Sequence, residues 1–187
     1  MRIIGGKLKG KKLFYLDLKV TRPLRDYVKE NIFNIICHSK AIEIKIKGSK
    51  ILDLFSGSGP FGIECLSREA QFTTFVEKDK DAMNIIRKNI NFLSIEKNTN
   101  LFQTEINHFL EERIDKEKYD IIFLDPPYSN TDYIKNIKKI KELKCYNKKH
   151  LIILHRDINS KEIYDNFINI IFIKKYGRSK VIFGFIN

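Results

Sequence analysis

The sequence predicts an α/β fold with a doubly wound, mainly parallel sheet and an antiparallel edge. Short apolar runs alternate with amphipathic helical segments along most of the chain, which is the order expected for repeated βαβ units. The apolar run 51–54 leads directly into a Gly-x-Gly-x-x-Gly motif at 57–62, the strand, turn and helix of a ligand cradle. The last two apolar runs flank Gly177-Arg178 and predict a terminal hairpin.

The first forty residues precede this pattern. Residues 2–15 predict a small hairpin punctuated by glycines. The segment 21–23 (Thr-Arg-Pro) predicts an extended approach to a helix at 24–38, because a residue before proline avoids the helical region. Apolar residues of that helix recur at i, i+4, i+7 and i+8, and we expect Lys29, on the opposite face, to point toward solvent or a partner.

The remaining segments alternate regularly. Strands are expected at 51–54, 72–77, 99–103, 119–124, 151–154, 169–176 and 179–186. Helices are expected at 60–69, 81–93, 108–113 and 132–143. Pro60 lies in the first turn of its helix, where a missing N–H is tolerated. Seven strands in one sheet follow from this pattern.

Acidic residues stand at the carboxyl ends of four predicted strands, where open α/β sheets bind ligands. They are Asp53, Glu77, Glu105 and Asp125. The set resembles the site of enzymes that use S-adenosylmethionine (SAM), and in such a site Asp53 would face the methionine end, Glu77 the ribose, and Glu105 with Ile106 the adenine. The glycine motif alone also fits nicotinamide and flavin sites, so the choice of SAM depends on Asp53, on Glu77 about 20 residues after Gly57, and on the run Asp125-Pro-Pro-Tyr128.

The run 125–128 has a chemistry of its own. Two consecutive prolines fix the backbone, so the carbonyl of Pro126 keeps one direction. Asp125 and that carbonyl could accept the two N–H groups of an exocyclic amine, while Tyr128 stacks on the base. Such a base must leave its helix or come from a loop. With the glycine loop, this run resembles the SAM-dependent amino-group methyltransferases.

The charge balance indicates a polyanionic partner. The chain has 187 residues, and 35 Lys and Arg against 23 Asp and Glu give a net charge of +12. Lysines crowd the first segment at positions 7, 9, 11 and 12, as in loops that bind phosphates. Biased composition and a solvated terminus remain alternatives to nucleic-acid binding.

Cysteines and histidines indicate no special chemistry. The three cysteines are widely spaced, which predicts a reducing, cytoplasmic compartment, and Cys37 and Cys65 are expected to be buried structural thiols. Histidines 38, 108, 150 and 155 lack metal-ligand spacing, so no metal is expected, and each is predicted to lie at the surface or its boundary. No apolar run reaches the ~18 residues of a membrane span, and no targeting segment is expected.

Nearly the whole chain resembles the bacterial methyltransferases that modify the N2 amino group of a guanine in 16S rRNA, the guanine(966)-N(2) enzymes. The resemblance rests on Arg2-Ile-Ile-Gly-Gly6 with Gly10-Lys-Lys-Leu13, Arg22-Pro23, Asp26, Val28, Glu30, Phe33-Asn34, the segments 53–59 and 62–68, Asp125–Tyr128 and Tyr176-Gly177. The sequence departs from the family pattern at Leu24, Arg25, Tyr27, Pro60 and Glu69, which leaves the catalytic run intact.

The resemblance implies a Rossmann-like class I SAM-dependent methyltransferase at 41–187 with an RNA-facing extension at 1–40, acting as a monomer on small-subunit rRNA or an assembling subunit. Expected cofactor-binding residues are Asp53, Phe55, Ser56, Gly57, Ser58, Gly59, Glu77, Lys78, Glu105 and Ile106. Expected catalytic residues are Asp125, Pro126, Pro127 and Tyr128. Expected RNA-binding residues are Arg2, Lys7, Lys9, Lys11, Lys12, Arg22 and Arg25.

Other classes of function account for less of the sequence. A nicotinamide dehydrogenase leaves the Pro-Pro run without a role. A DNA adenine-N6 methyltransferase would use a similar run, but the chain has no room for a separate target-recognition domain. A non-catalytic rRNA-binding assembly factor would be expected to have lost the glycines or Asp125, and both are present.

Overall fold

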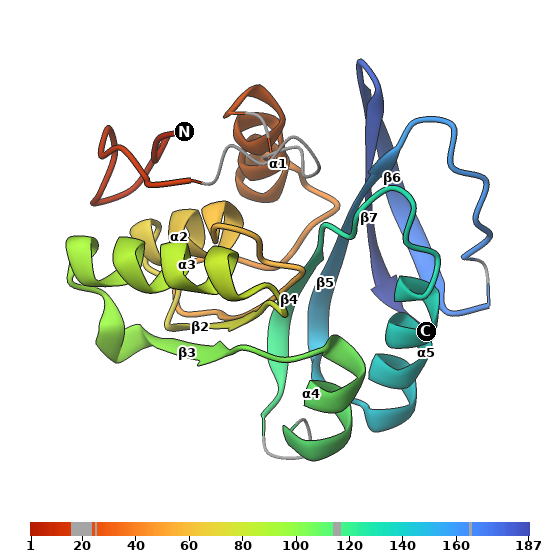
Figure 1. The fold of residues 1–187 in the computed structure, drawn as a ribbon. Coiled ribbons are helices and arrows are strands. Elements are labelled where there is room, and N and C mark those ends of the chain that lie inside the picture. Colours follow the sequence, from red (N-terminus) through yellow and green to blue (C-terminus); the bar gives the residue numbers. More distant parts are fainter. Residues whose placement is uncertain (16–23, 25, 114–116, 165) are drawn as a thin grey trace.

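A computed structural model describes the chain apart from residues 16–23, 25, 114–116 and 165 (Figure 1). Its centre is a seven-stranded sheet in the order β3-β2-β1-β4-β5-β7-β6. The strands are β1 (Lys50–Leu54), β2 (Phe72–Val76), β3 (Thr99–Phe102), β4 (Tyr119–Leu124), β5 (Tyr146–Asp157), β6 (Ile168–Tyr176) and β7 (Ser179–Ile186). Strands β1 to β5 are parallel, and β7 runs antiparallel to both of its neighbours, β5 and β6.

Helices cover both faces of the sheet (Figure 1). They are α1 (Asp26–His38), α2 (Pro60–Ser67), α3 (Lys80–Leu93), α4 (Ile106–Arg113) and α5 (Tyr133–Leu143), with a short 3-10 helix η1 (Glu96–Asn98) before β3. Helices α1, α2 and α3 pack on one face, and α4 and α5 pack on the other. This is the doubly wound fold that the sequence predicts.

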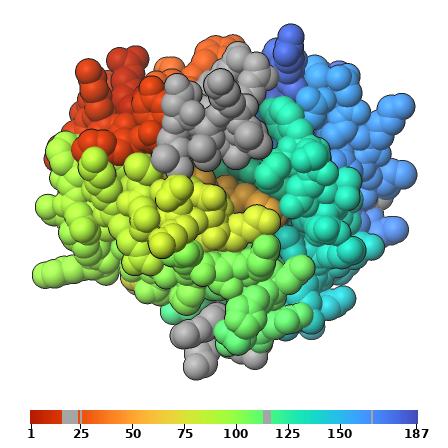
Figure 2. Space-filling model, viewed as in Figure 1, coloured from red at the N-terminus to blue at the C-terminus, as the bar shows by residue number. Residues whose placement is uncertain are grey.

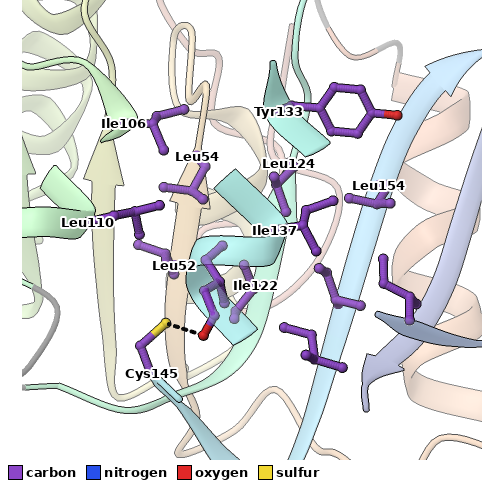
Figure 3. Packing of buried hydrophobic residues seen from close by; sticks show 14 of the residues in the cluster. Leu52, Leu54, Ile106, Leu110, Ile122, Leu124, Tyr133, Ile137, Cys145 and Leu154 are labelled. Carbon is purple, nitrogen blue, oxygen red and sulfur yellow. Dashed lines mark hydrogen bonds between the residues drawn. The ribbon is translucent and has the colours of Figure 1, made fainter. Parts of the chain in front are cut away.

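Apolar side chains that alternate between the two faces of the central strands form a hydrophobic core on each side of the sheet. In β1 and β4, Leu52, Leu54, Ile122 and Leu124 face α4 and α5, whereas Ile51 and its neighbours on the other face pack under α1 and α2. Figure 3 shows the first of these cores. Because successive strand residues point to opposite faces, a strand buried on both sides is expected to be apolar along most of its length, and Asp53 of β1 is a buried exception.

The elements match the predicted ranges closely, with two differences in extent. Strand β5 runs from Tyr146 to Asp157 rather than over 151–154, because polar residues occupy both ends of the strand and only its centre is apolar. The N-terminal hairpin is limited to one antiparallel bridge between Arg2 and Lys12, closed around the tight turns at 5–10.

The N-terminal segment is fixed to α2 by a buried carboxylate. Glu64, which is fully buried, accepts hydrogen bonds from the backbone N–H groups of Ile4 at 2.8 Å and Gly5 at 2.7 Å. The Ser67 hydroxyl donates to the Gly5 carbonyl, and the Leu8 N–H donates to that hydroxyl. Residues 1–14 are therefore packed against the main domain.

Two expectations about residues of α1 are wrong. Lys29 does not point to solvent: it is fully buried, donates to the Arg2 carbonyl at 2.7 Å and lies 3.8 Å from a Glu64 oxygen. Helix α1 turns this residue inward because the N-terminal segment provides acceptors there. Cys37 is exposed, whereas Cys65 is buried as expected.

Candidate active site

The glycine loop and the run 125–128 meet at the point where the strand order reverses. Leu54 and Leu124 are paired at the ends of β1 and β4, and the Asp125 N–H donates to the Leu54 carbonyl at 3.4 Å. In Figure 2 the surface is hollowed here, with the gold segment after β1 visible between the yellow start of α3 and the teal segment that follows β4. Ligands of doubly wound sheets bind at this switch point.

The glycine loop takes its shape from left-handed backbone. Phe55, Gly57 and Gly59 have φ values of 57°, 56° and 78°. A Cβ added to Gly57 would meet no atom within 4 Å, so this glycine serves the turn and leaves room beside the backbone. Gly62 serves packing, because an added Cβ would lie 2.4 Å from the ring of Phe75 on β2.

Ser56 and Asp53 support the loop from below. The Ser56 hydroxyl donates to the Asp53 carbonyl at 2.6 Å and accepts from the Val76 N–H at 3.1 Å, so this buried side chain ties the end of β1 to β2. The Asp53 carboxyl is 1% exposed, and its Oδ2 accepts from the Gly62 N–H at 3.0 Å. Burial raises the pKa of Asp53 well above its ordinary value.

Glu77 links the end of β2 to the glycine loop. Its carboxylate accepts from the Gly57 N–H and from the Asp79 N–H, each at 2.9 Å. Lys78 and Glu105 are both exposed and form an ion pair at 3.2 Å between the ends of β2 and β3. Ile106 is 6% exposed and belongs mainly to the core. The expected ribose and adenine contacts are therefore near one another, with Glu77 the most firmly held.

The run 125–128 is held by two consecutive residues of β5. His155 Nδ1 lies 2.8 Å from Asp125 Oδ1, and the rings of His155 and Tyr128 meet edge to face with centroids 6.1 Å apart. Asp125 and Tyr128 are half-buried, whereas His155 is 6% exposed. The expectation that these histidines lie at the surface or boundary is wrong for His155, because the carboxylate gives its ring a partner inside, and also for His150, which is 8% exposed.

Arg156 holds the backbone of the same run. Its guanidinium donates to the carbonyls of Pro126 at 3.4 Å, Pro127 at 3.2 Å and Tyr128 at 3.2 Å, and it forms an ion pair with Glu162 at 2.7 Å. Burial opposes ionisation of Glu162, but the hydrogen bond and the charge of Arg156 outweigh it and lower the pKa of Glu162 to about 2. The positive charge of buried Arg156 is thus balanced by the negative charge of Glu162.

The predicted RNA-binding residues lie along the N-terminal segment. Arg2, Lys9, Lys11 and Lys12 are exposed, whereas Lys7 is paired with Glu69 at 2.7 Å, beyond the end of α2 that is opposite the glycine loop. Arg22 and Arg25 lie outside the described residues. The segment then turns back toward the site at Phe14.

Sequence reasoning missed three side chains that shape the site. Asn89 of α3, fully buried, donates to the carbonyls of Phe14 at 2.9 Å and Ser58 at 3.3 Å, which connects the N-terminal segment to the glycine loop. His155 and Arg156 are the other two. Because they follow the apolar run of their strand, they stand at its carboxyl end, as the four acids do, and that position was an available signal.

Neither a membrane span nor a metal cluster is found in the described part of the chain. Among those residues no helix combines the length and apolar character needed to cross a membrane. Nor do they contain a group of three or more His, Cys, Asp or Glu side chains that could hold a metal ion.

This arrangement defines a class of protein. The order of the sheet, the glycine loop at the end of β1, the acid at the tip of β2 and the Asp-Pro-Pro-Tyr corner after β4 are those of a Rossmann-like SAM-dependent methyltransferase. The open space beside Gly57, next to the Glu77 carboxylate, suits a cofactor that brings ribose hydroxyls to a loop of free backbone.

Comparison with known proteins identifies the family. The model of the family described as Conserved hypothetical protein 95 matches residues 1–185, and the chain belongs to this family. "Ribosomal RNA small subunit methyltransferase D" of Buchnera aphidicola (subsp. Acyrthosiphon pisum) is 36% identical over 83% of this chain and 77% of its own length. The protein of the same name from Haemophilus influenzae is 38% identical over 68% of this chain and 64% of its own length.

A solved structure agrees with the fold over the whole length. The protein described as "Putative methyltransferase yhhF from Escherichia coli" superposes with a TM-score of 0.84 at 26% identity, covering 98% of this chain and 96% of that one. The resemblance noted in the sequence is confirmed at the level of the family, and the sheet with its antiparallel C-terminal strands is confirmed as the fold.

Proposed function

We propose that this protein transfers a methyl group from SAM to the exocyclic N2 amino group of a guanine in small-subunit rRNA, at the position that the guanine(966)-N(2) enzymes modify. The observation that carries the proposal is the Asp125 carboxylate at the switch point, beside the glycine loop and with one oxygen held by His155. Names of the relatives support rRNA as the substrate class.

The chain's own groups hold the target amine. The lone pair of a guanine amino group is delocalised into the ring, so the nitrogen is a poor nucleophile. Asp125 and the Pro126 carbonyl, accepting its two N–H groups, draw it toward tetrahedral geometry and stabilise the positive charge that develops. As the new N–C bond forms, the electron pair of the S–C bond would stay on the sulfur of the cofactor, and the proton that the amine loses would pass to Asp125. The Pro126 carbonyl already accepts a long bond of 3.4 Å from Arg156, and its second lone pair is left for the amine.

The cofactor supplies an electrophilic methyl group when bound. In this proposal Phe55 to Gly59 hold it by backbone, Asp53 lies toward its methionine end through Oδ1, and Glu77 accepts from the ribose. Lys78, Glu105 and the edge of Ile106 surround the adenine. Asp53 Oδ2 and both Glu77 oxygens already accept backbone N–H groups, so these acids are oriented before a ligand arrives.

The partner in this proposal is 16S rRNA within the small subunit or its assembly intermediate, met by a monomer. Arg2, Lys9, Lys11 and Lys12 supply phosphate contacts, and Tyr128 stacks on the extruded base. The net charge of +12 favours such a partner.

Methyl transfer from labelled SAM to unmodified small-subunit particles tests the proposal. Nuclease digestion and mass spectrometry of the nucleosides should reveal N2-methylguanosine at one position. N6-methyladenosine, or SAM binding without any methylated guanine, would contradict it and favour the adenine or assembly-factor alternatives.

A further inference from the structure

The end of β5 carries two buried polar side chains to which the proposed function assigns no role of their own. His155 and Arg156 are 6% and 1% exposed, among the few buried polar residues of the sheet. Both turn toward the residues that follow β4, His155 to a side chain and Arg156 to the backbone. Buried polar groups are retained where they have partners, and here the partners are the corner 125–128.

His155 restricts the Asp125 carboxylate. Because a carboxylate can only accept, Nδ1 of the ring carries the proton and donates to Oδ1 at 2.8 Å. The ring is itself held by β5 and by its edge contact with Tyr128. With Oδ1 occupied, Oδ2 is left to meet an incoming N–H group, and rotation of the carboxylate would break an existing hydrogen bond.

Arg156 restricts the backbone. One planar guanidinium donates to three successive carbonyls, and its position is fixed by Glu162 at 2.7 Å and by the ring of Tyr133, 4.4 Å below it. The Tyr133 hydroxyl is in turn 2.5 Å from the Tyr164 hydroxyl. The proline rings fix φ, and Pro127 narrows the ψ range of Pro126, but they do not fix the remaining rotation of the three carbonyls, which the guanidinium restricts further.

We infer that His155 and Arg156 are positioning residues of the methyl-transfer site: His155 aims the free oxygen of Asp125, and Arg156 aims the Pro126 carbonyl, at the target amine. This inference rests on the proposed function. It assigns to β5 a role in the rate of the reaction rather than in binding of SAM or RNA.

The charge of His155 adds a consequence for pH. The groups that face it are Asp125 and the Tyr128 ring after β4, with Arg156 beside it on β5 and Asp53 beyond Asp125 on β1. Burial lowers the pKa of His155, but the charge of Asp125 and its hydrogen bond outweigh burial and raise that pKa above its usual value. A protonated ring weakens Asp125 as an acceptor, so the rate should rise as pH rises through this pKa.

The test compares methyl transfer by His155→Phe and His155→Asn with that of the unchanged protein, on the same RNA substrate and across pH 6 to 9. Phenylalanine keeps the ring but removes the donor, so kcat should fall by about 10- to 100-fold while SAM affinity and the KM for RNA stay within about threefold. Asparagine can donate from a similar place, so it should restore most of kcat and abolish the rise with pH.

His150→Phe is the matched control, because His150 is a buried histidine within the same strand, five residues before His155, and is hydrogen-bonded to the Asn147 carbonyl and the Ile186 N–H. This substitution should lower the melting temperature without changing kcat.

Arg156 is tested in the same way. Arg156→Met should lower kcat, and Arg156→Lys should recover part of the lost rate.

A kcat for His155→Phe within twofold of the unchanged protein at every pH would overturn the inference, as would loss of SAM or RNA affinity in proportion to rate. Asp125→Ala separates the two claims. If that variant is inactive while His155→Phe is normal, only the positioning role fails; if Asp125→Ala keeps its full rate, the proposed function of the site fails.

Discussion

Asp125 is the residue on which the proposed chemistry depends most. Replacing it with alanine should lower kcat by about 10²- to 10³-fold, because an acceptor aimed at developing charge is lost. SAM affinity, measured by calorimetry, should stay nearly unchanged, since the proposed cofactor residues lie at the carboxyl ends of β1, β2 and β3 rather than β4. Asp132→Ala, which removes an exposed acid paired with Lys135, is the control and should be fully active. A loss of SAM affinity equal to the loss of rate would contradict this role.

At the scale of elements, the contact between α2 and β2 depends on a missing side chain. A Cβ at Gly62 would lie 2.4 Å from Phe75 Cε1 and 2.7 Å from Thr73 Cγ2, so Gly62→Ala should lower the free energy of unfolding by about 1–3 kcal/mol. Denaturant titration measures it. Phe75→Leu makes room, and the double variant should be more stable than the sum of the two single changes predicts. Strict additivity would show that the close approach does not limit packing.

The N-terminal segment depends on one buried carboxylate in a similar way. Glu64→Gln should lower the free energy of unfolding by about 3–5 kcal/mol, because it removes the buried counter-charge of Lys29 and leaves only Asp26, a partly exposed acid 3.8 Å away. Burial already lowers the pKa of Lys29, and Glu64 acts against that. Limited proteolysis should then cut within residues 7–12.

Glu43→Gln is the control for that experiment. Glu43 pairs with Lys149 at 2.7 Å, but both side chains are about 70% exposed, so no measurable loss of stability is expected. Equal effects of the two substitutions would mean that Glu64 does not anchor the segment.

Contacts such as that between Lys29 and Glu64 could not be predicted from the sequence, although the positions of the strands could. Apolar runs located the seven strands, because each strand turns at least part of its length toward a core. They could not predict the polar ends of β5, where His155 depends on Asp125. Nor could they predict that Lys29 is buried, because the partner of Lys29, Glu64, is far away in the sequence. Local patterns report burial by apolar atoms, whereas buried polar groups are decided by tertiary partners.

The same distinction applies to the candidate site. Its acids and glycines were predictable, since strand ends in a doubly wound sheet share one edge. Their supports were not: Ser56 and Asn89 act through backbone groups that only the fold brings near. The N-terminal lysines could be predicted, but their partners could not. Lys7 forms an ion pair with Glu69 at one end of α2, and Asn89 connects the residues that follow the lysines to the glycine loop.

At the scale of the whole molecule, the net charge of +12 has two readings, a solvated surface or an interface for RNA. Replacing Lys9, Lys11 and Lys12 with glutamine should weaken RNA binding and reduce the slope of log K against log salt by about 2, since each contact with a single strand contributes about 0.7. Lys97, Lys118 and Lys144 are exposed and precede β3, β4 and β5, at the edge of the sheet opposite the site. The same change there alters net charge equally and should leave the slope unchanged. Equal slopes for both triple variants would mean that charge acts only as a diffuse field, with no phosphate contacts in the N-terminal segment.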